Sequence, residues 1–175
     1  MATGSVLLPV SAAILPDGTT NNLAPAIQRV KGSAANPTPF FLQLAFDAGS
    51  DEFCMWSFRM PADYASGPVL KVQFKMVSAT TGNVVILCRV AAVTPGDATD
   101  VDAKTFASAN TSAATAVPST TAGKLGEISL TLANNDSLAA NDFAMVRLAR
   151  LGSDAGDTAT GDMEVVAVTL EYTTA

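Results

Sequence analysis

The sequence predicts an all-β fold, an antiparallel β-sandwich of jelly-roll-like type with an extended N-terminal arm. Three observations predict it. Apolar and polar residues alternate with a period of two through several short runs. Turn residues separate these runs, and no window shows the pattern of a long amphipathic helix. The 175 residues also have the length of a single domain that buries a core.

The first 38 residues differ from the remainder. They contain four prolines and the polar run PDGTTNN, and they show little periodicity. We interpret residues 1–38 as an extended arm with one or two short strands, suited to wrapping a neighbouring subunit. Residues 39–175 then form the sandwich domain. The start of the chain has no basic region of the kind that begins a secretion signal, so we expect synthesis in the cytoplasm.

Four segments in the first half of the sandwich domain show strand patterns. FFLQLAF at residues 40–46 alternates, which predicts that Phe40, Leu42, Leu44 and Phe46 share one face. EFCMWSFRM at residues 52–60 is apolar on both faces, as expected of a strand that is covered on both sides. LKVQFKM at residues 70–76 separates an apolar face from a polar one. NVVILCRVAAV at residues 83–93 is again apolar on both faces.

Three more strands are predicted in the second half. A low-complexity stretch rich in Ala, Thr and Ser at residues 107–123 first predicts a long surface loop with a short edge strand. EISLTL at residues 127–132 alternates clearly, and FAMVRLAR at residues 143–150 alternates more weakly. EVVAVTLEY at residues 164–172 places Val166, Val168, Leu170 and Tyr172 on one predicted face.

The composition excludes some classes of partner. Hydrophobic residues make up 49% of the chain and charged residues 15%, against roughly a quarter charged in a typical domain. Such a surface favours burial against other subunits. The net charge of −6 and the scattered basic residues predict no nucleic-acid or membrane partner. The longest apolar runs are also shorter than the roughly 18 residues that a membrane-spanning helix needs.

The residues that usually carry catalysis are scarce. The chain has no histidine, which is the commonest general base and zinc ligand. It has no nucleotide-binding or hydrolase motif either. We therefore predict a protein that is not an enzyme, with no catalytic residue and no cofactor. Cys54 and Cys88 lie among apolar strand residues, so buried free thiols are the favoured interpretation and a disulfide is the alternative.

Three aspartates form a weak candidate for a metal site. Asp97, Asp100 and Asp102 lie within six residues, but Gly96 precedes them and their spacing does not match an EF-hand. Calcium also binds to irregular loops, so the site stays a candidate. The favoured alternative is a turn at PGD followed by aspartates that cap a short helical turn and face water. The polar connection at residues 152–162, with its own aspartates, allows the same two interpretations.

Two aromatic residues are candidates for stacking against a sugar ring. Trp56 shares a strand face with Cys54 and Phe58, so we expect it in the core. Tyr64 lies in PADYASGP, which reads as a loop. We therefore expect Tyr64 to be at least partly exposed, either as a possible ligand-stacking residue or as a lid over the edge of the sandwich.

The middle and C-terminal phrases resemble a known class of domain. MPADYASGPVLKVQF, AVTPGDATDVDAKTF, KLGEISLTLANNDSLAANDFAMVRLAR and DTATGDMEVVAVTLEY together resemble a β-sandwich domain encoded among the virion genes of tailed bacteriophages. The resemblance covers roughly residues 51–173. Domains of this type are associated with head decoration (cement) proteins and with fibre-like appendages.

The resemblance implies a structural protein on the capsid surface of the virion. The resemblance also implies that it binds and stabilises the assembled phage head as a homotrimer, with the major capsid protein as partner. The alternative is a fibre or receptor-binding module that binds carbohydrate. A fibre tip is expected to follow a coiled stalk, and the sequence has no heptad segment, which favours decoration.

Overall fold

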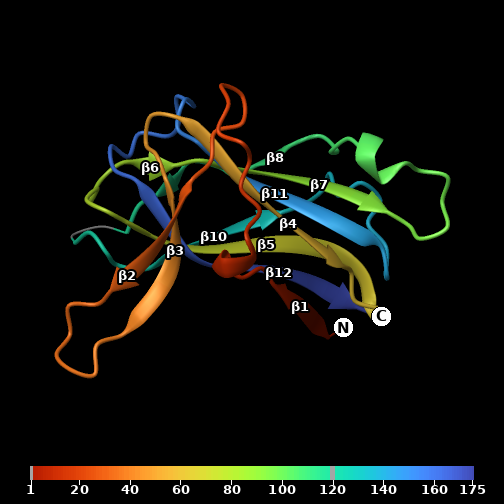
Figure 1. Ribbon diagram of the computed structural model, residues 1–175, viewed down its shortest axis with the longest axis horizontal. Helices are drawn as coiled ribbons and strands as arrows, with labels where there is room; N and C mark the ends of the chain where they lie inside the picture. Colours follow the sequence, from red (N-terminus) through yellow and green to blue (C-terminus); the bar gives the residue numbers. More distant parts are fainter. Residues whose placement is uncertain (1, 119–120) are drawn as a thin grey trace.

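The computed structural model describes residues 2–118 and 121–175 and is an antiparallel, jelly-roll-like β-sandwich, which confirms the predicted fold class (Figure 1). Among these residues the only helices are two short 3-10 turns, η1 (Val10–Ala12) and η2 (Val101–Ala103). No helix in the described ranges has the length and apolar character to cross a membrane.

The first sheet has six strands in the order β10-β5-β12-β3-β2, and β1 also pairs with β12. Its strands are β1 (Thr3–Leu7), β2 (Ala26–Lys31), β3 (Phe40–Phe46), β5 (Tyr64–Met76), β10 (Gly126–Thr131) and β12 (Met163–Thr174). The central strand β12 pairs with β5 along its length, whereas β3 and β1 take successive parts of its other edge. The point between β3 and β1 is therefore a discontinuity in the sheet.

The second sheet has the order β4-β11-β7-β8 and packs against the first. Its strands are β4 (Asp51–Arg59), β7 (Ile86–Val93), β8 (Asn110–Thr111) and β11 (Phe143–Leu151). A separate two-stranded ribbon joins β6 (Asn83–Val84) to β9 (Thr115–Ala116). All seven predicted strands are present, and the predicted strand at residues 83–93 is divided into β6 and β7. The short strands β8 and β9 lie in the predicted surface loop.

The core lies between the two sheets. Trp56 is buried there as predicted, and its indole N–H donates to the carbonyl oxygen of Pro9 at 2.9 Å. Cys54 and Cys88 are free buried thiols, which confirms the favoured interpretation. Full burial of an aliphatic or aromatic side chain contributes about 1.5–3 kcal/mol. The alternating strands therefore hold the sandwich together mainly through these inward-facing residues.

A β-bulge in β12 corrects one predicted face. The pairing of β12 with β5 shifts register between Val165 and Ala167. Val165 points into the core and is fully buried, while Val166 is only half-buried. Because the bulge inserts one residue, the alternation changes phase at this point and Val166 leaves the face that it shares in the sequence pattern with Val168.

The N-terminal segment, expected to form an arm, is integrated into the sandwich. β1 pairs with β12, and Leu8 and Val10 are part of the core. Farther along, Ile14 and Leu23 form bridges to the outer edge of β4. The expected boundary at residue 38 lies in the loop between β2 and β3, two paired strands of one sheet. Deleting residues 1–38 would therefore remove core residues and two strands of the first sheet.

Candidate functional site

The hairpin formed by β2 and β3 projects from the sandwich (Figure 1). β3 pairs with β12 only through residues 44–46. Residues 40–43 have β2 as their one partner strand, so the outer half of the hairpin is a two-stranded ribbon. Isolated two-stranded hairpins are marginally stable in water. The ribbon therefore depends on its anchored root or on a further surface that covers it.

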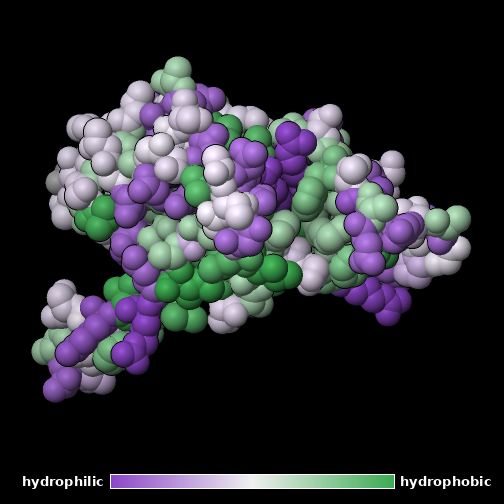
Figure 2. All heavy atoms as spheres, turned by 45° about the horizontal axis from the view of Figure 1, so that its top comes forward, coloured by the Kyte–Doolittle hydropathy of each residue, from purple (hydrophilic) through white to green (hydrophobic). Residues whose placement is uncertain are grey.

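Large apolar side chains are exposed on and beside this hairpin. Phe40 is 57% exposed and Leu7, on the neighbouring β1, is 65% exposed. We call the following set the hairpin surface: Leu7, Ile27, Phe40, Phe41 and Leu42. Figure 2 shows hydrophobic side chains gathered where the hairpin leaves the body. Phe40 and Leu42 are exposed although Leu44 and Phe46 on the same predicted face are buried, because the outer part of β3 extends beyond the sandwich.

A shallow apolar hollow lies next to the hairpin surface. Its volume is about 300 Å³, and residues 7–11 together with Phe41, Leu42, Val166 and Ala167 line it. It lies at the discontinuity between β3 and β1, where the bulge of β12 turns Val166 outward. The protruding hairpin and this hollow are both apolar and occupy neighbouring parts of one surface.

The hairpin also differs in charge from the rest of the protein. Residues 26–46 contain Arg29 and Lys31 and no acidic residue. Removing these two charges from the net charge of −6 leaves −8 for the remainder. The guanidinium carbon of Arg29 lies 5.8 Å from the ring centroid of Phe40. The hairpin is thus apolar at its root and carries positive charge farther out, and the body is negative.

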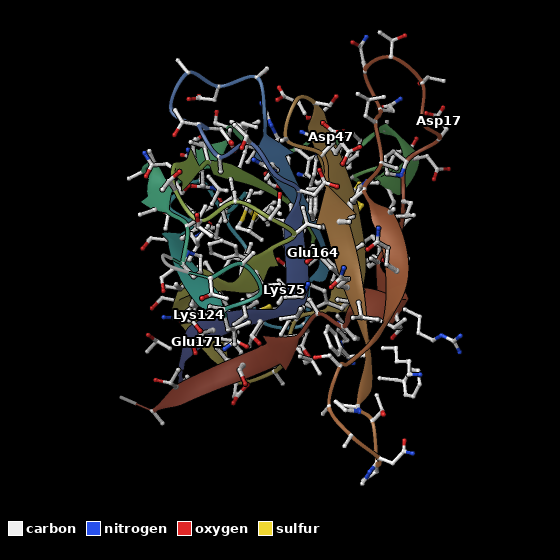
Figure 3. The ribbon with its side chains drawn as sticks, turned by 90° about the vertical axis from the view of Figure 1, so that its left-hand side faces the viewer. Asp17, Asp47, Lys75, Lys124, Glu164 and Glu171 are labelled. Carbon is white, nitrogen blue, oxygen red and sulfur yellow. The ribbon has the colours of Figure 1, made fainter. Side chains whose placement is uncertain are left out.

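A chain of polar contacts fixes the root of the hairpin. The side-chain amide of Gln43 donates to Gln28 of β2 at 2.8 Å and also to Glu164 of β12. Glu164 forms an ion pair with Lys75 of β5, and Figure 3 shows the two side chains next to each other. Gln43 and Glu164 are both buried. These contacts run across four strands and hold the base of the hairpin in one orientation.

The outer face of the second sheet carries a groove. Three hollows of about 460, 430 and 240 Å³ adjoin there. Arg147 and Asn21 line the first two, and Met55 lines the second and third. Residues 14–23 of the N-terminal segment form one wall of the groove. Residues 101–106 form the other wall at the second and third hollows. We call this feature the Arg147 groove.

Two arginines face each other across neighbouring strands in and beside this groove. Arg147 of β11 and Arg89 of β7 are register partners. The guanidinium carbon of Arg147 lies 3.9 Å from the ring centroid of Phe53. No acidic residue in the described ranges forms an ion pair with either arginine, and their buried Nε atoms have no hydrogen-bond partner. Burial and the nearby charge of Arg89 lower the pKa of Arg147, while Asp51 opposes the shift.

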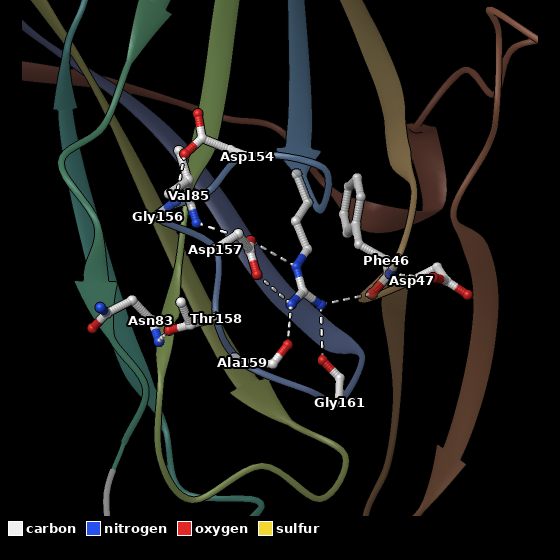
Figure 4. Close-up of polar contacts among 12 residues, drawn as sticks. Phe46, Asp47, Asn83, Val85, Asp154, Gly156, Asp157, Thr158, Ala159 and Gly161 are labelled. Atoms are coloured by element: carbon white, nitrogen blue, oxygen red, sulfur yellow. Dashed lines mark hydrogen bonds and ion pairs between the residues drawn. The ribbon is translucent and has the colours of Figure 1, made fainter.

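Figure 4 shows a buried ion pair that the sequence pattern did not reveal. The guanidinium of Arg150 donates to Asp157 at 2.8 and 3.0 Å, and both side chains are inaccessible to solvent. It also donates to the carbonyl oxygens of Phe46, Ala159 and Gly161. The pair fastens the connection at residues 152–162 to both sheets. Asp157 is thus a structural residue, whereas the sequence suggested an aspartate in a solvated loop.

The candidate calcium aspartates lie in an exposed loop. The backbone N–H of Asp97 closes a turn on the carbonyl of Thr94, and Asp100 accepts a hydrogen bond from the backbone N–H of Asp102 at 3.0 Å. Asp100 is the N-cap of η2. The described residues contain no cluster of three side chains that is suited to holding a metal ion. The local geometry is therefore that of a turn and a cap.

Tyr64 does not occupy the exposed position that its sequence context suggested. It is the first residue of β5, is only 6% exposed, and packs on Tyr172 with ring centroids 5.5 Å apart. Burial raises the pKa of Tyr64. Because β5 begins earlier than the alternating pattern indicates, the ring belongs to the end of the core and is not available to stack on a ligand.

Comparison with known proteins adds the following. No protein-family model matches the chain, and no curated protein matches it. A family 11 carbohydrate-binding module from Clostridium thermocellum, solved in complex with a β-1,3-1,4-mixed-linked tetrasaccharide, is 11% identical, with 97% of this chain and 96% of that chain covered and a TM-score of 0.43. The carbohydrate-binding module CBM28, specific for non-crystalline cellulose, is 7% identical, with coverages of 95% and 94% and a TM-score of 0.39. The likeness concerns the β-sandwich fold alone.

Proposed function

We propose that this protein is a structural component of a bacteriophage particle, a decoration protein that binds the surface of the assembled head as a homotrimer. The resemblance of residues 51–173 to virion β-sandwich domains supports this class of function. In this proposal the protein is made in the host cytoplasm and joins the virion by contact with the major capsid protein. It has no catalytic task.

The hairpin surface is the observation that carries the proposal. Exposed apolar clusters of this kind mark protein interfaces. Covering a side chain such as Phe40 or Leu7 contributes up to about 1.5–3 kcal/mol, so the five members together supply a substantial part of an interface. The positive charge of the hairpin matches a negatively charged partner, and the body of a second copy carries such a charge.

The hairpin surface and the apolar hollow share Leu7, Phe41 and Leu42. In our proposal the outer part of the hairpin of one copy, with Phe40, lies against the hollow of the next. Contacts between unlike patches generate closed rings when the rotation between copies permits it, and three copies are the smallest such ring above a dimer. A trimer then presents three equivalent attachment surfaces to the shell, which adds avidity to contacts that are individually weak.

Decoration stabilises a shell by mass action. A protein that binds the assembled shell but not its separated subunits shifts the equilibrium toward assembly. The fibre alternative requires a surface that recognises carbohydrate by aromatic stacking. The chain's one tryptophan and both tyrosines are buried, and the exposed aromatic rings are those of phenylalanines such as Phe40. The scarcity of Trp and Tyr rings at the surface is the observation that favours decoration over a fibre tip of that type.

The test combines sedimentation with binding to heads. Wild-type protein is expected to sediment as a trimer and to pellet with undecorated heads of the phage that encodes it. Phe40→Ser removes a side chain that is already 57% exposed, so it should leave the fold intact while it weakens the trimer. Leu125→Ser, at 58% exposure and next to the opposite edge of the first sheet, is the matched control and should remain trimeric.

Two results would contradict the proposal. If the wild-type protein sediments as a monomer at micromolar concentration, the proposed trimer is wrong. If it forms a trimer that does not pellet with undecorated heads, the proposed decoration role is wrong and only the self-association stands.

A further inference from the structure

Four of the ten basic residues, Lys71, Lys75, Lys104 and Arg150, form ion pairs within the described parts of the chain. Arg147 and Arg89 form none there, and Arg89 donates only to the carbonyl oxygen of Ala107. They lie side by side on one sheet face although the chain has 16 acidic residues. Like charges on directly opposed strand positions are destabilising. An anion bound between them would relieve that repulsion.

The Arg147 groove offers several chemical functions along its length. Arg147 provides a positive charge at the point where the two larger hollows meet. The side chains of Asn21 and Asn22 line the same region, and an amide both donates and accepts hydrogen bonds. Phe53 and Met55 contribute apolar surface. The two larger hollows are shallow and adjoin each other, so together they suit an elongated ligand that lies along the surface.

The border of the groove argues against an extended peptide as the ligand. One way in which an extended peptide gains affinity is by adding a strand to an open sheet edge. The edge of β4 is already occupied here. Met55 exchanges two backbone hydrogen bonds with Ile14, at 2.8 and 2.9 Å, and the N–H of Phe53 donates to Leu23 at 3.0 Å. Recognition in the groove therefore has to come from side chains.

We propose that the Arg147 groove binds an anionic oligosaccharide, with an acidic group of the sugar chain seated at Arg147. In this arrangement the guanidinium of Arg147, supported by the charge of Arg89, binds the carboxylate. The two asparagine amides bind hydroxyl groups, and the apolar floor contacts the C–H face of a sugar ring. Asp51 and Asp102 line the two ends of the groove. They confine the negatively charged group to its centre.

This site is separate from the surface that the proposed function uses. The groove lies on the outer face of the second sheet, and the hairpin surface belongs to the first. Binding in the groove is therefore independent of self-association, and the failure of one proposal leaves the other standing.

The test is a calorimetric titration of the full chain with three probes of similar length. The acidic sugar is tetragalacturonate, the neutral control is cellotetraose, and the acidic peptide is tetraglutamate. We expect tetragalacturonate to bind at least about tenfold more tightly than cellotetraose, since hydrogen bonds to charged groups are the stronger ones. Its affinity should fall as the ionic strength rises. Tighter binding of tetraglutamate than of tetragalacturonate would overturn the proposal and indicate an acidic peptide as the ligand. An absence of binding by all three probes would also overturn the proposal.

Two variants locate the site. Arg147→Leu keeps an apolar stem over Phe53 and removes the charge, so we expect a loss of about tenfold or more in affinity for tetragalacturonate. Arg59→Leu is the matched control, because Arg59 lies on the same face of β4's sheet and lines none of the three hollows. It should bind as the wild type does. Equal affinity of both variants would overturn the assignment.

A readout on the wild-type protein covers the case in which Arg147→Leu does not fold. In NMR spectra, tetragalacturonate should shift the side-chain amide signals of Asn21 and Asn22 and leave that of Asn141 unchanged. Shifts confined to residues outside the groove would place the ligand elsewhere and contradict the proposal.

Discussion

Replacing Asp157 by alanine tests the structural role of the buried ion pair. Its carboxylate accepts two hydrogen bonds from Arg150 and a third, at 3.0 Å, from the backbone N–H of Val85. In Asp157→Ala the guanidinium keeps its three carbonyl acceptors but loses its counter-charge, and the Val85 N–H loses its acceptor. Both groups stay in the interior because the surrounding strands hold them there.

The expected loss is large relative to the stability of one domain. Removing one partner of a buried ion pair costs about 3–5 kcal/mol. Total stabilities are about 5–15 kcal/mol. For a chain of this length, 1 kcal/mol lowers the melting temperature by about 2–4 °C, so we expect a decrease of roughly 6–20 °C.

Thermal and denaturant unfolding at one fixed protein concentration measure this loss. Asp154→Ala is the matched control in the same connection, because Asp154 is exposed and caps only the N–H of Gly156. Its loss should stay at about 1 kcal/mol or less. The double variant Arg150→Met with Asp157→Leu should be more stable than Asp157→Ala, since it removes the unpaired charge. A loss below about 1 kcal/mol for Asp157→Ala would refute the reasoning.

Three further predictions concern titration and metal binding. Burial raises the pKa of Cys88 to about 12 and also raises that of Cys54, so a thiol reagent at pH 8 should label neither in the native protein and both in denaturant. Chelator should leave the melting temperature unchanged if residues 94–106 hold no calcium. A fall of several degrees would support a calcium site in this loop. Burial raises the pKa of Glu52, so its ionisation opposes folding, and this destabilisation grows as the pH rises above 4.5 and is complete above the raised pKa. Glu52→Gln should therefore stabilise the protein at neutral pH, with a gain that disappears below the ordinary pKa of 4.5.

The alternation of residues was enough to predict the strands and most of the core. Val72 and Phe74 face inward in β5 as the pattern indicates, and Trp56 is buried in β4. Such local features follow from sequence because a period of two assigns each side chain to one face of a strand. The short capped turn at residues 101–103 follows from local chemistry for the same reason.

Tertiary structure alone decided which faces are covered. Phe40 shares a strand face with Phe46, but only Phe46 has the second sheet above it, because β3 continues past the end of the sandwich. The bulge beside Val166 depends on how β12 pairs with β5. Arg147 and Arg89 meet only because β11 and β7 are neighbours in the sheet. A strand pattern specifies the direction of a side chain, whereas its surroundings depend on the partners that distant parts of the chain bring to it.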